Sequence, residues 1–175
     1  MHRRDLLKGA LGAAGLSAIS GPALAAATAP RALSLVNLHT GEALKAIYWE
    51  AGKYVPDAMA ALNRVLRDHR TGEVYDMAPG LLDLVASLTD KLDTKQTVQV
   101  ISGYRSPKTN AALHAQSNGV ATRSLHMKGE AMDIRIAGVE LSRLRDAALS
   151  LQRGGVGFYP GSNFVHVDIG RVRRW

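Results

Sequence analysis

The sequence predicts a single domain of the α+β class, in which helices pack against a small antiparallel sheet. Its 175 residues fit one domain with a modest tail. A hydrophobic content of 46% can supply a core, and because aromatic residues make up only 5%, we expect that core to consist mainly of Leu, Val, Ala and Ile. In the second half of the chain the expected helices are segregated from short strands joined by turns, which is the pattern of an α+β domain.

The first half of the chain is expected to form a hairpin followed by two helices. Residues 32–38 alternate well enough for a strand, and turn residues at 39–42 lead into a return strand at 43–50. Pro56 and Pro79 each suit the first position of a helix, and apolar residues follow both prolines at helical spacing. We interpret these apolar stripes as core rather than as a face for a cofactor or a membrane.

The second half of the chain is expected to contribute four strands and two helices. Residues 97–101 are rich in β-branched side chains, and Pro160 and Gly161 supply a turn between the last two strands. A polar stretch at 117–124 is expected to form a surface loop. The predicted strands occupy residues 97–101, 131–136, 154–159 and 163–169, and the predicted helices occupy residues 107–116 and 141–151.

The N-terminal segment is predicted to be an export signal rather than part of the fold. Arg3 and Arg4 form a twin arginine ahead of a weakly apolar stretch, and Ala23 and Ala25 are the small residues that a signal peptidase recognises. A transmembrane anchor is the alternative, but the stretch is too short and too rich in Gly and Ala to span roughly 30 Å of hydrocarbon. We therefore expect a periplasmic protein without stable membrane insertion. The predicted division is a twin-arginine signal peptide at 1–25, a linker at 26–31 and a folded domain at 32–175.

The charge of the chain is strongly basic, with a formal net charge of +7 and a pI near 10. Such a balance can indicate a nucleic-acid-binding protein, but the sequence has no run of Lys and Arg interleaved with aromatic residues. The basic cluster at residues 171–175 has two interpretations, a solvated terminus or a contact for a polyanionic partner. Because the chain has no cysteine, disulfides contribute nothing to its stability.

Two histidines and an aspartate near the end of the chain are the most informative residues. His126, Asp133 and His166 offer two imidazoles and one carboxylate, which can bind a zinc ion and leave one position open for water. A structural zinc site is normally closed by four protein ligands, often thiolates, and this chain has no cysteine to supply a thiolate. An open site is more typical of a hydrolase.

The spacing of these residues permits a common site without forcing it. A turn at Gly129 can bring His126 and Asp133 to one ion, and strand alternation places His166 and Asp168 on the same face. Taken alone, each histidine is more often a surface or core residue than a ligand. The other four histidines, which we interpret in that way, are His2, His39, His69 and His114.

Three motifs in the second half of the chain carry a resemblance to a known family. They are Ser-Gly-Tyr-Arg-Ser-Pro at 102–107, Ser-x-His-x-x-Gly-x-Ala-x-Asp at 124–133 and Gly-Val-Gly-Phe-Tyr-Pro-x-Ser-Asn-Phe-Val-His-Val-Asp at 155–168. Together they resemble the zinc peptidases of bacterial cell walls, which include D-alanyl-D-alanine carboxypeptidases and dipeptidases, murein endopeptidases and the related hedgehog domain. The branch that the chain resembles most is the twin-arginine-exported murein endopeptidases of Gram-negative bacteria. The resemblance covers about residues 32–175 and implies the hedgehog-like fold of that family.

The resemblance implies roles for five side chains. It implies that His126, Asp133 and His166 bind Zn²⁺, that Arg105 projects toward the scissile carbonyl, and that Ser124 lines the substrate pocket. Zinc would activate a water molecule and polarise the carbonyl. The guanidinium could stabilise the developing oxyanion or bind a substrate carboxylate. The open alternatives are a structural ion pair for the arginine and a loop or cap hydroxyl for the serine.

One position departs from the pattern of the family. Many relatives have Glu or Asp as general base three residues before the last histidine ligand, where this chain has Asn163, which cannot take a proton. Asp168 is then the candidate, either as the base or as a residue that orients a ligand. Two further interpretations are that the metal activates the water without a strong protein base, or that the chain has kept the metal and lost catalysis.

The function that the resemblance implies is zinc-dependent hydrolysis of peptidoglycan. The chain would cleave an amide bond in murein peptide stems or cross-links, as an endopeptidase rather than a carboxypeptidase, and it is expected to be a monomer. A basic surface would suit the carboxylates and phosphates of the bacterial wall. The alternative is a non-catalytic wall-binding module that retains zinc, for which Asn163 is the main support. Export and the metal-binding residues both argue against a nucleic-acid partner.

Overall fold

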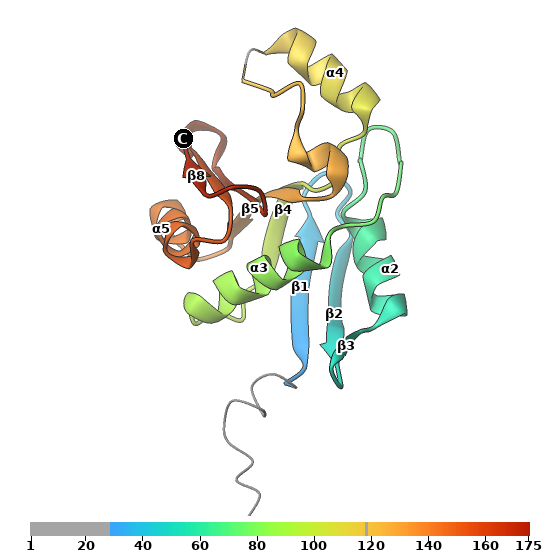
Figure 1. Ribbon diagram of the computed structural model, residues 1–175, viewed down its shortest axis with the longest axis vertical. Helices are drawn as coiled ribbons and strands as arrows, with labels where there is room; N and C mark the ends of the chain where they lie inside the picture. The colour runs from blue at the N-terminus through green and yellow to red at the C-terminus, as the bar shows by residue number, and fades with distance from the viewer. Residues whose placement is uncertain (1–28, 118) are drawn as a thin grey trace, which may run out of the picture.

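The computed structural model describes residues 29–117 and 119–175, so the predicted signal peptide and the first half of the predicted linker lie outside the described residues. Within these ranges the chain forms one eight-stranded sheet, four α-helices and two short 3-10 helices (Figure 1). The strands are β1 (Arg31–Asn37), β2 (Ala43–Glu50), β3 (Lys53–Tyr54), β4 (Val98–Ser102), β5 (Ala131–Ile136), β6 (Gly155–Tyr159), β7 (Phe164–Asp168) and β8 (Arg173–Arg174). The helices are α2 (Pro56–Val65), α3 (Pro79–Lys91), α4 (Pro107–Gln116) and α5 (Leu141–Leu151), and the 3-10 helices are η1 (Leu125–Lys128) and η2 (Pro160–Ser162).

The starts of three α-helices follow from proline. Pro56, Pro79 and Pro107 each stand in the first turn, where the missing N–H has no helical partner to lose. Ser106 also caps α4, because its hydroxyl accepts a hydrogen bond from the backbone N–H of Thr109. The predicted helix starts are therefore confirmed.

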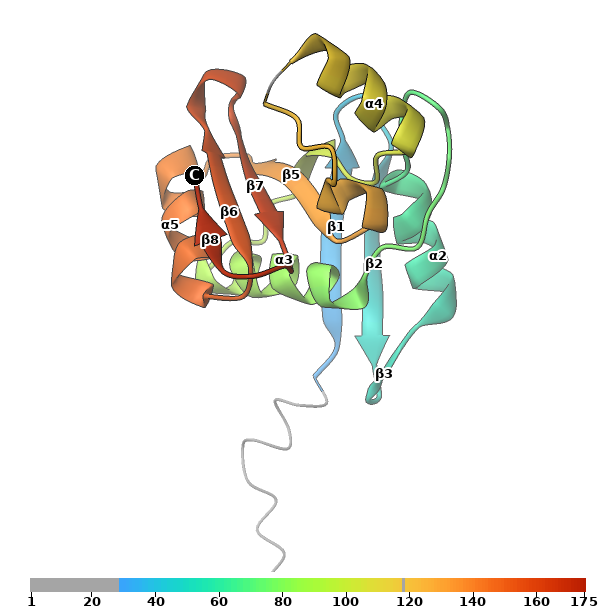
Figure 2. The same ribbon diagram turned by 45° about the horizontal axis from the view of Figure 1, so that its top comes forward.

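The sheet has the order β3-β2-β1-β4-β5-β7-β6-β8. The α+β class is confirmed, but the sheet is larger than expected and is mixed, because β1 pairs with β4 and β6 pairs with β8 in parallel. The central part, β4-β5-β7-β6, is antiparallel as predicted. Figure 2 shows β5, β7, β6 and β8 side by side. In the described part of the chain, no helix is both long and apolar enough to cross a membrane.

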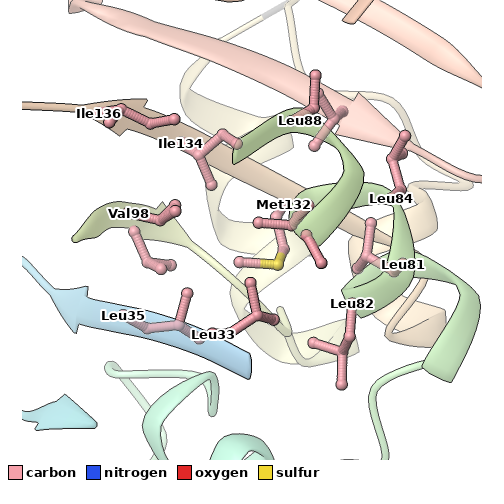
Figure 3. Packing of buried hydrophobic residues seen from close by; sticks show 14 of the residues in the cluster. Leu33, Leu35, Leu81, Leu82, Leu84, Leu88, Val98, Met132, Ile134 and Ile136 are labelled. Atoms are coloured by element: carbon pink, nitrogen blue, oxygen red, sulfur yellow. The ribbon is translucent and has the colours of Figure 1, made fainter. Parts of the chain in front are cut away.

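One face of the sheet packs against α2, α3 and α5 and forms a single core (Figure 3). On β5 the core side chains are Met132, Ile134 and Ile136, and on β7 they are Val165 and Val167. Successive side chains of a strand point to opposite faces. The residues that alternate with these five therefore point away from the core, and it is among them that the polar side chains of β5 and β7 lie.

The hairpin is attached to α3 through one carboxylate. Asp83 accepts hydrogen bonds from the hydroxyls of Tyr48 and Tyr54, and its Oδ1 lies 2.5 Å from Nη1 of Arg31. Burial raises the pKa of Asp83, but these three donors outweigh burial and leave the pKa below its usual range. The contact fixes β1, β2 and β3 relative to α3.

The elements that the sequence did not predict are the short ones. They are β3, β8, η1 and η2, each of two to four residues. The C-terminal segment 171–175 is also not a simple solvated tail, because β8 pairs with β6 and Trp175 continues that pairing by donating its backbone N–H to Val156. Tertiary contacts with β6 hold the segment in this position. Local sequence patterns do not reveal such contacts, so the strand was not predicted.

Candidate metal centre

Three segments bring the predicted metal ligands together. His126 lies in η1, Asp133 on β5 and His166 on β7. In the antiparallel register of these two strands Asp133 stands directly opposite His166, and both point away from the core. η1 contacts β5 and adds the second imidazole. The convergence that spacing alone left open is thus present in the fold.

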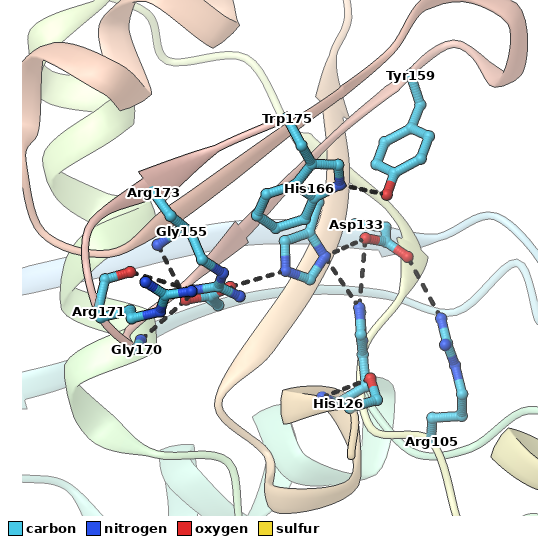
Figure 4. Close-up of polar contacts among 12 residues, drawn as sticks. Arg105, His126, Asp133, Gly155, Tyr159, His166, Gly170, Arg171, Arg173 and Trp175 are labelled. Atoms are coloured by element: carbon cyan, nitrogen blue, oxygen red, sulfur yellow. Dashed lines mark hydrogen bonds and ion pairs between the residues drawn. The ribbon is translucent and has the colours of Figure 1, made fainter. Parts of the chain in front are cut away.

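The donor atoms of the three side chains are close enough to share one ion (Figure 4). Nε2 of His126 lies 3.2 Å from Nδ1 of His166, and Oδ1 of Asp133 lies 3.3 Å and 2.8 Å from these two nitrogens. Ligand atoms that surround a tetrahedral zinc at roughly 2.0–2.2 Å lie roughly 3.3–3.6 Å apart. Two of the three separations match this spacing and the third, 2.8 Å between Asp133 and His166, is shorter. A small opening of this pair would let the donor set hold a small divalent cation.

When both imidazoles are neutral, their hydrogen bonds leave the two facing nitrogens without a proton. Nδ1 of His126 lies 2.7 Å from the carbonyl oxygen of Gly103, which can only accept, so this nitrogen carries the hydrogen. Nε2 of His166 lies 3.0 Å from Oδ2 of Asp168 and donates in the same way. In neutral imidazoles the opposite nitrogens then present lone pairs to each other and to Asp133. Three electron-rich atoms that converge in this way can bind a cation.

The electrostatics of the centre agree with cation binding. Burial raises the pKa of Asp133, but the neighbouring imidazoles of His126 and His166 outweigh burial and place the pKa below its usual range. Burial lowers the pKa of His166, but the neighbouring carboxylates of Asp133 and Asp168 outweigh burial and raise it. An ionised carboxylate and an imidazole between two anions both favour positive charge at this point.

One glycine and one serine hold His126 in place. Gly129 ends η1 in the left-handed region with a φ of 66°, and a Cβ there would lie 2.5 Å from the carbonyl oxygen of Asp76. The hydroxyl of Ser124 accepts a hydrogen bond from the backbone N–H of His126 and caps η1. Ser124 also lines the cleft beside the ligands, so the structure combines its cap position with the pocket position that the resemblance implied.

Asp168 is enclosed by hydrogen-bond donors. It is fully buried, and besides His166 it accepts hydrogen bonds from both Nη atoms of Arg173 and from the backbone N–H groups of Gly155 and Gly170. Burial raises the pKa of Asp168, but these donors outweigh burial and hold the pKa below its usual range. The carboxylate is therefore ionised and saturated.

Arg105 reaches the ligand cluster from the loop after β4. Its Nη2 lies 3.5 Å from Oδ2 of Asp133, and its backbone N–H donates to the carbonyl oxygen of His126. Burial lowers the pKa of Arg105, and the negative charge of Asp133 acts in the opposite direction. Its Nε is buried and has no hydrogen-bond partner among the described residues. The guanidinium thus lies at the centre with donor capacity that the protein leaves unused.

A cleft of about 610 Å³ opens beside the ligands. Among the predicted residues it is lined by Arg105, Ser124 and the three ligands, whereas Asn163 is exposed outside it, in a left-handed conformation that ends η2. The described lining includes residues that the sequence did not single out, namely Arg123, Tyr159, Phe164, Arg173 and Trp175. The available signal was Gly155-x-Gly157, whose missing side chains leave room for two of them.

Comparisons with known proteins identify the family of the chain. A family model described as peptidoglycan L,D-endopeptidase MepK matches residues 25–175. The peptidoglycan L,D-endopeptidase MepK of Escherichia coli strain K12 is 48% identical over 178 residues, which cover 99% of this chain and 97% of that protein. The probable peptidoglycan L,D-endopeptidase MepK of Haemophilus influenzae is 44% identical over 147 residues, with coverages of 83% and 79%. The resemblance inferred from three motifs is confirmed, and the chain belongs to this M15 family of peptidoglycan endopeptidases.

Proposed function

We propose that the chain is a zinc-dependent endopeptidase of peptidoglycan, which cleaves an amide bond of the L,D type in murein peptide stems or cross-links. The observation that carries the proposal is the convergence of His126, Asp133 and His166 beside an open cleft, with the other nitrogen of each imidazole bonded to an acceptor of the protein. The names of relatives that are nearly half identical along the whole chain support the substrate and the bond type.

Zinc suits the donor set of this centre. Two imidazole nitrogens and one carboxylate oxygen beside an open cleft are the usual ligands of a catalytic zinc site. When bound, Zn²⁺ supplies a Lewis acid that polarises a carbonyl and lowers the pKa of water. His126, Asp133 and His166 hold it, and the carbonyl of Gly103 and the carboxylate of Asp168 fix the orientation of the two imidazoles.

Arg105 is proposed to stabilise the negative charge that develops on the carbonyl oxygen of the substrate. Its guanidinium is positioned next to Asp133, is largely shielded from water and has unused donor capacity. A purely structural ion pair would be closer than the 3.5 Å observed between Nη2 and Oδ2, since charge-assisted N–H···O bonds are usually about 2.7–2.9 Å long.

Asp168 is proposed to orient His166 rather than to act as general base. A base must have a lone pair directed at the attacking water, but the carboxylate of Asp168 is fully buried and already accepts from five donor atoms. Asn163 cannot take a proton and lies outside the cleft. Neither residue can then serve as a strong protein base, and a metal held by His126, Asp133 and His166 would have to supply the acidity of the attacking water. This predicts a slow enzyme.

The experiment that tests this function is digestion of purified murein sacculi followed by chromatography of the released fragments. Metal-loaded protein is expected to release new muropeptides, a chelator to stop the release, and added Zn²⁺ to restore it. His126→Ala is expected to be inactive, whereas His39→Ala, which removes an imidazole that does not line the cleft, is the matched control. Equal release by the wild-type protein and His126→Ala would falsify the metal mechanism.

A non-catalytic, zinc-retaining wall-binding module is the second candidate. The observation that favours it is Asn163 in place of the expected acid. The same digest separates the two functions, because a binding module would sediment with sacculi and release no new fragments.

We also propose export by the twin-arginine route, with a signal peptide at 1–25, a linker at 26–31 and a monomeric domain from about residue 32 in the periplasm. The twin arginine at Arg3-Arg4 and a wall substrate support this location. Replacement of both arginines by lysine is expected to retain the protein in the cytoplasm, as cell fractionation would show. Unchanged periplasmic recovery would contradict the route.

A further inference from the structure

The side of the cleft formed by β6, β7 and β8 is aromatic. Trp175 lies there with its ring centroid 5.2 Å from that of His166, and its Nε1–H donates to the hydroxyl of Tyr159 at 2.6 Å. Tyr159 stacks in turn on Phe164, with 4.6 Å between ring centroids. All three aromatic residues line the cleft, and Trp175 is 50% exposed. A large apolar ring is thus presented to solvent next to a metal ligand.

The backbone holds Trp175 in this position. Its N–H donates to the carbonyl of Val156, and its carbonyl accepts from the N–H of Phe158, so the residue extends the parallel pairing of β8 with β6. The guanidinium of Arg173 lies 4.9 Å from the centroid of the indole and also binds Asp168. The ring is therefore fixed in the free protein and loses little entropy when a ligand contacts it.

The sequence of β6 makes room for the indole. A Cβ at Gly157 would lie 2.7–2.8 Å from three atoms of the Trp175 ring, which is closer than non-bonded atoms approach. Gly157 has no positive φ, so its backbone conformation does not by itself require glycine. The absence of a side chain at this position is explained by the close approach of the indole.

The opposite side of the cleft carries the guanidinium of Arg105. In the sheet order β4-β5-β7-β6-β8, the strands that carry Asp133 and His166 lie between Arg105, which follows β4, and Trp175 (Figure 4). Arg123, in the segment before η1, also lines the cleft. A peptide that crosses the metal ligands therefore meets the guanidinium of Arg105 on one side and the indole on the other.

We propose that Trp175 is a substrate-binding residue, whose indole packs against the aliphatic side chain of the stem-peptide residue next to the scissile amide. Residues of murein stems carry both alkyl chains and carboxylates, and the two sides of the cleft match these two parts. The exposed indole removes alkyl surface from water, whereas Arg105 and Arg123 suit the carboxylates. This inference depends on the proposed function for its substrate.

Kinetics on a cross-linked dimer of stem peptides test the role. Trp175→Ala is expected to raise KM about fivefold to tenfold, because contacts of one aromatic ring contribute about 1 kcal/mol, while kcat stays within about twofold. Trp175→Phe keeps an aromatic ring, so its KM is expected to lie between those of the wild-type protein and Trp175→Ala. Gly157→Ala leaves Trp175 in the sequence but displaces the ring, so it is expected to raise KM in the same direction. Metal content, measured in each protein, is expected to be unchanged.

A binding measurement separates this inference from the proposed function, because the only two tryptophans are Trp49 and Trp175. Trp49 lies on β2, where it packs against Tyr54 and Arg31, and β2 is three places from β5 in the sheet. Trp49→Phe therefore keeps the indole of the cleft, and Trp175→Phe keeps the remote one. The metal-free form of each protein is titrated with the stem tetrapeptide L-Ala-D-Glu-diaminopimelyl-D-Ala, and tryptophan emission is followed.

The emission of Trp49→Phe is expected to change saturably, and that of Trp175→Phe is expected to stay constant. An unchanged KM in Trp175→Ala, a fall of kcat together with metal content, or a constant emission in Trp49→Phe would each overturn the proposal. Failure of the wild-type protein to hydrolyse sacculi would instead overturn the proposed function, and the titration would still decide whether Trp175 contacts the peptide.

Discussion

At the scale of single residues, the carboxylate of Asp168 connects the metal centre to the C-terminal segment. It accepts from His166 on one side and from Arg173 on the other, and it is completely buried. A buried carboxylate with this many donors is rigid, and it fixes which nitrogen of His166 faces the ion. Asp168 is either the general base or the residue that orients His166. Separate measurements of metal affinity and of the pH dependence of the rate can distinguish these two roles.

Asp168→Asn is expected to weaken metal binding about 10–100-fold, because the substitution removes the charge that holds the tautomer of His166. A competition titration against a chromogenic chelator measures this affinity. The pH–rate profile of the metal-saturated variant is expected to keep its acid limb, since the pKa of Asp168 in the wild-type protein already lies below the working range. Loss of the acid limb at unchanged metal affinity would identify Asp168 as the base.

Arg105→Lys tests stabilisation of the oxyanion. Lysine keeps the positive charge but not the planar fork of donors, so kcat is expected to fall about 100-fold while metal content and melting temperature change little. Steady-state kinetics on the cross-linked dimer give the number. A wild-type kcat in this variant would leave Arg105 as a structural partner of Asp133, at 3.5 Å.

Sequence reasoning identified the residues of the centre whose chemistry is distinctive. His126, Asp133 and His166 offer the donor atoms of a metal site, and the structure brings these atoms together. The indole of Trp175 was not predicted, because its role depends on a two-residue strand that pairs with β6. No local pattern signals a contact of that kind, although Gly157 marks the space that it occupies.

At the scale of elements, the loop 102–107 is held by the end of α2 and the turn that follows it. The N–H of Tyr104 donates to the carbonyl of Leu66, and the N–H of Ser106 donates to Oδ2 of Asp68. A Cβ at Gly103 would lie 2.4 Å from the carbonyl oxygen of Leu66, so only glycine permits this approach. The loop is thereby fixed at the residue before Arg105 and at the residue after it.

Asp68→Asn is expected to destabilise the protein by about 1–3 kcal/mol at neutral pH, because it weakens hydrogen bonds to a buried carboxylate. Burial raises the pKa of Asp68, but hydrogen bonds from Thr109 and Ser106 outweigh burial and lower it. A lowered folded-state pKa contributes stability above the unfolded value, near 4, and that stability is lost as the pH falls toward the folded value. The difference between wild type and variant in urea unfolding is therefore expected to narrow below about pH 4, and a constant difference would contradict this account.

The long elements were predictable because their signals are local. The prolines predicted the first residues of α2, α3 and α4 as the structure has them. The turn residues of the hairpin likewise predicted the bounds of β2. The parallel pairing of β1 with β4 was not predictable, because about 60 residues separate the paired positions, such as Leu35 and Val98. The same holds for η1, which depends on its cap by Ser124 and on the turn at Gly129.

At the scale of the whole molecule, the metal centre lies on the face of the sheet that points away from the core. The core of the described chain is apolar and continuous, whereas the opposite face at β5 and β7 gathers two imidazoles and two carboxylates. Unpaired charges are unfavourable in such a place unless a cation balances them. Metal binding is therefore expected to contribute to the stability of the entire domain.

Chelation is expected to lower the melting temperature of the wild-type protein. A ligand that binds only the folded state stabilises it by about 2.7 kcal/mol when its free concentration is 100 times Kd. Scanning calorimetry with zinc and with chelator measures the shift. His126→Ala serves as the control and is expected to melt at the same temperature under both conditions; an equal shift in that variant would place the stabilising ion elsewhere.

The antiparallel arrangement of β5 and β7 has a kinetic consequence. Asp133 and His166 are neighbours across the sheet, yet they lie 33 positions apart along the chain, with α5 between them. We therefore expect the ion-binding pocket to form late in folding, after the segment between β5 and β7 has packed onto the sheet. Zinc is expected to bind only after the domain has folded, so it stabilises the native state but not the transition state for folding. Stopped-flow experiments should therefore show slower unfolding with zinc and an unchanged refolding rate.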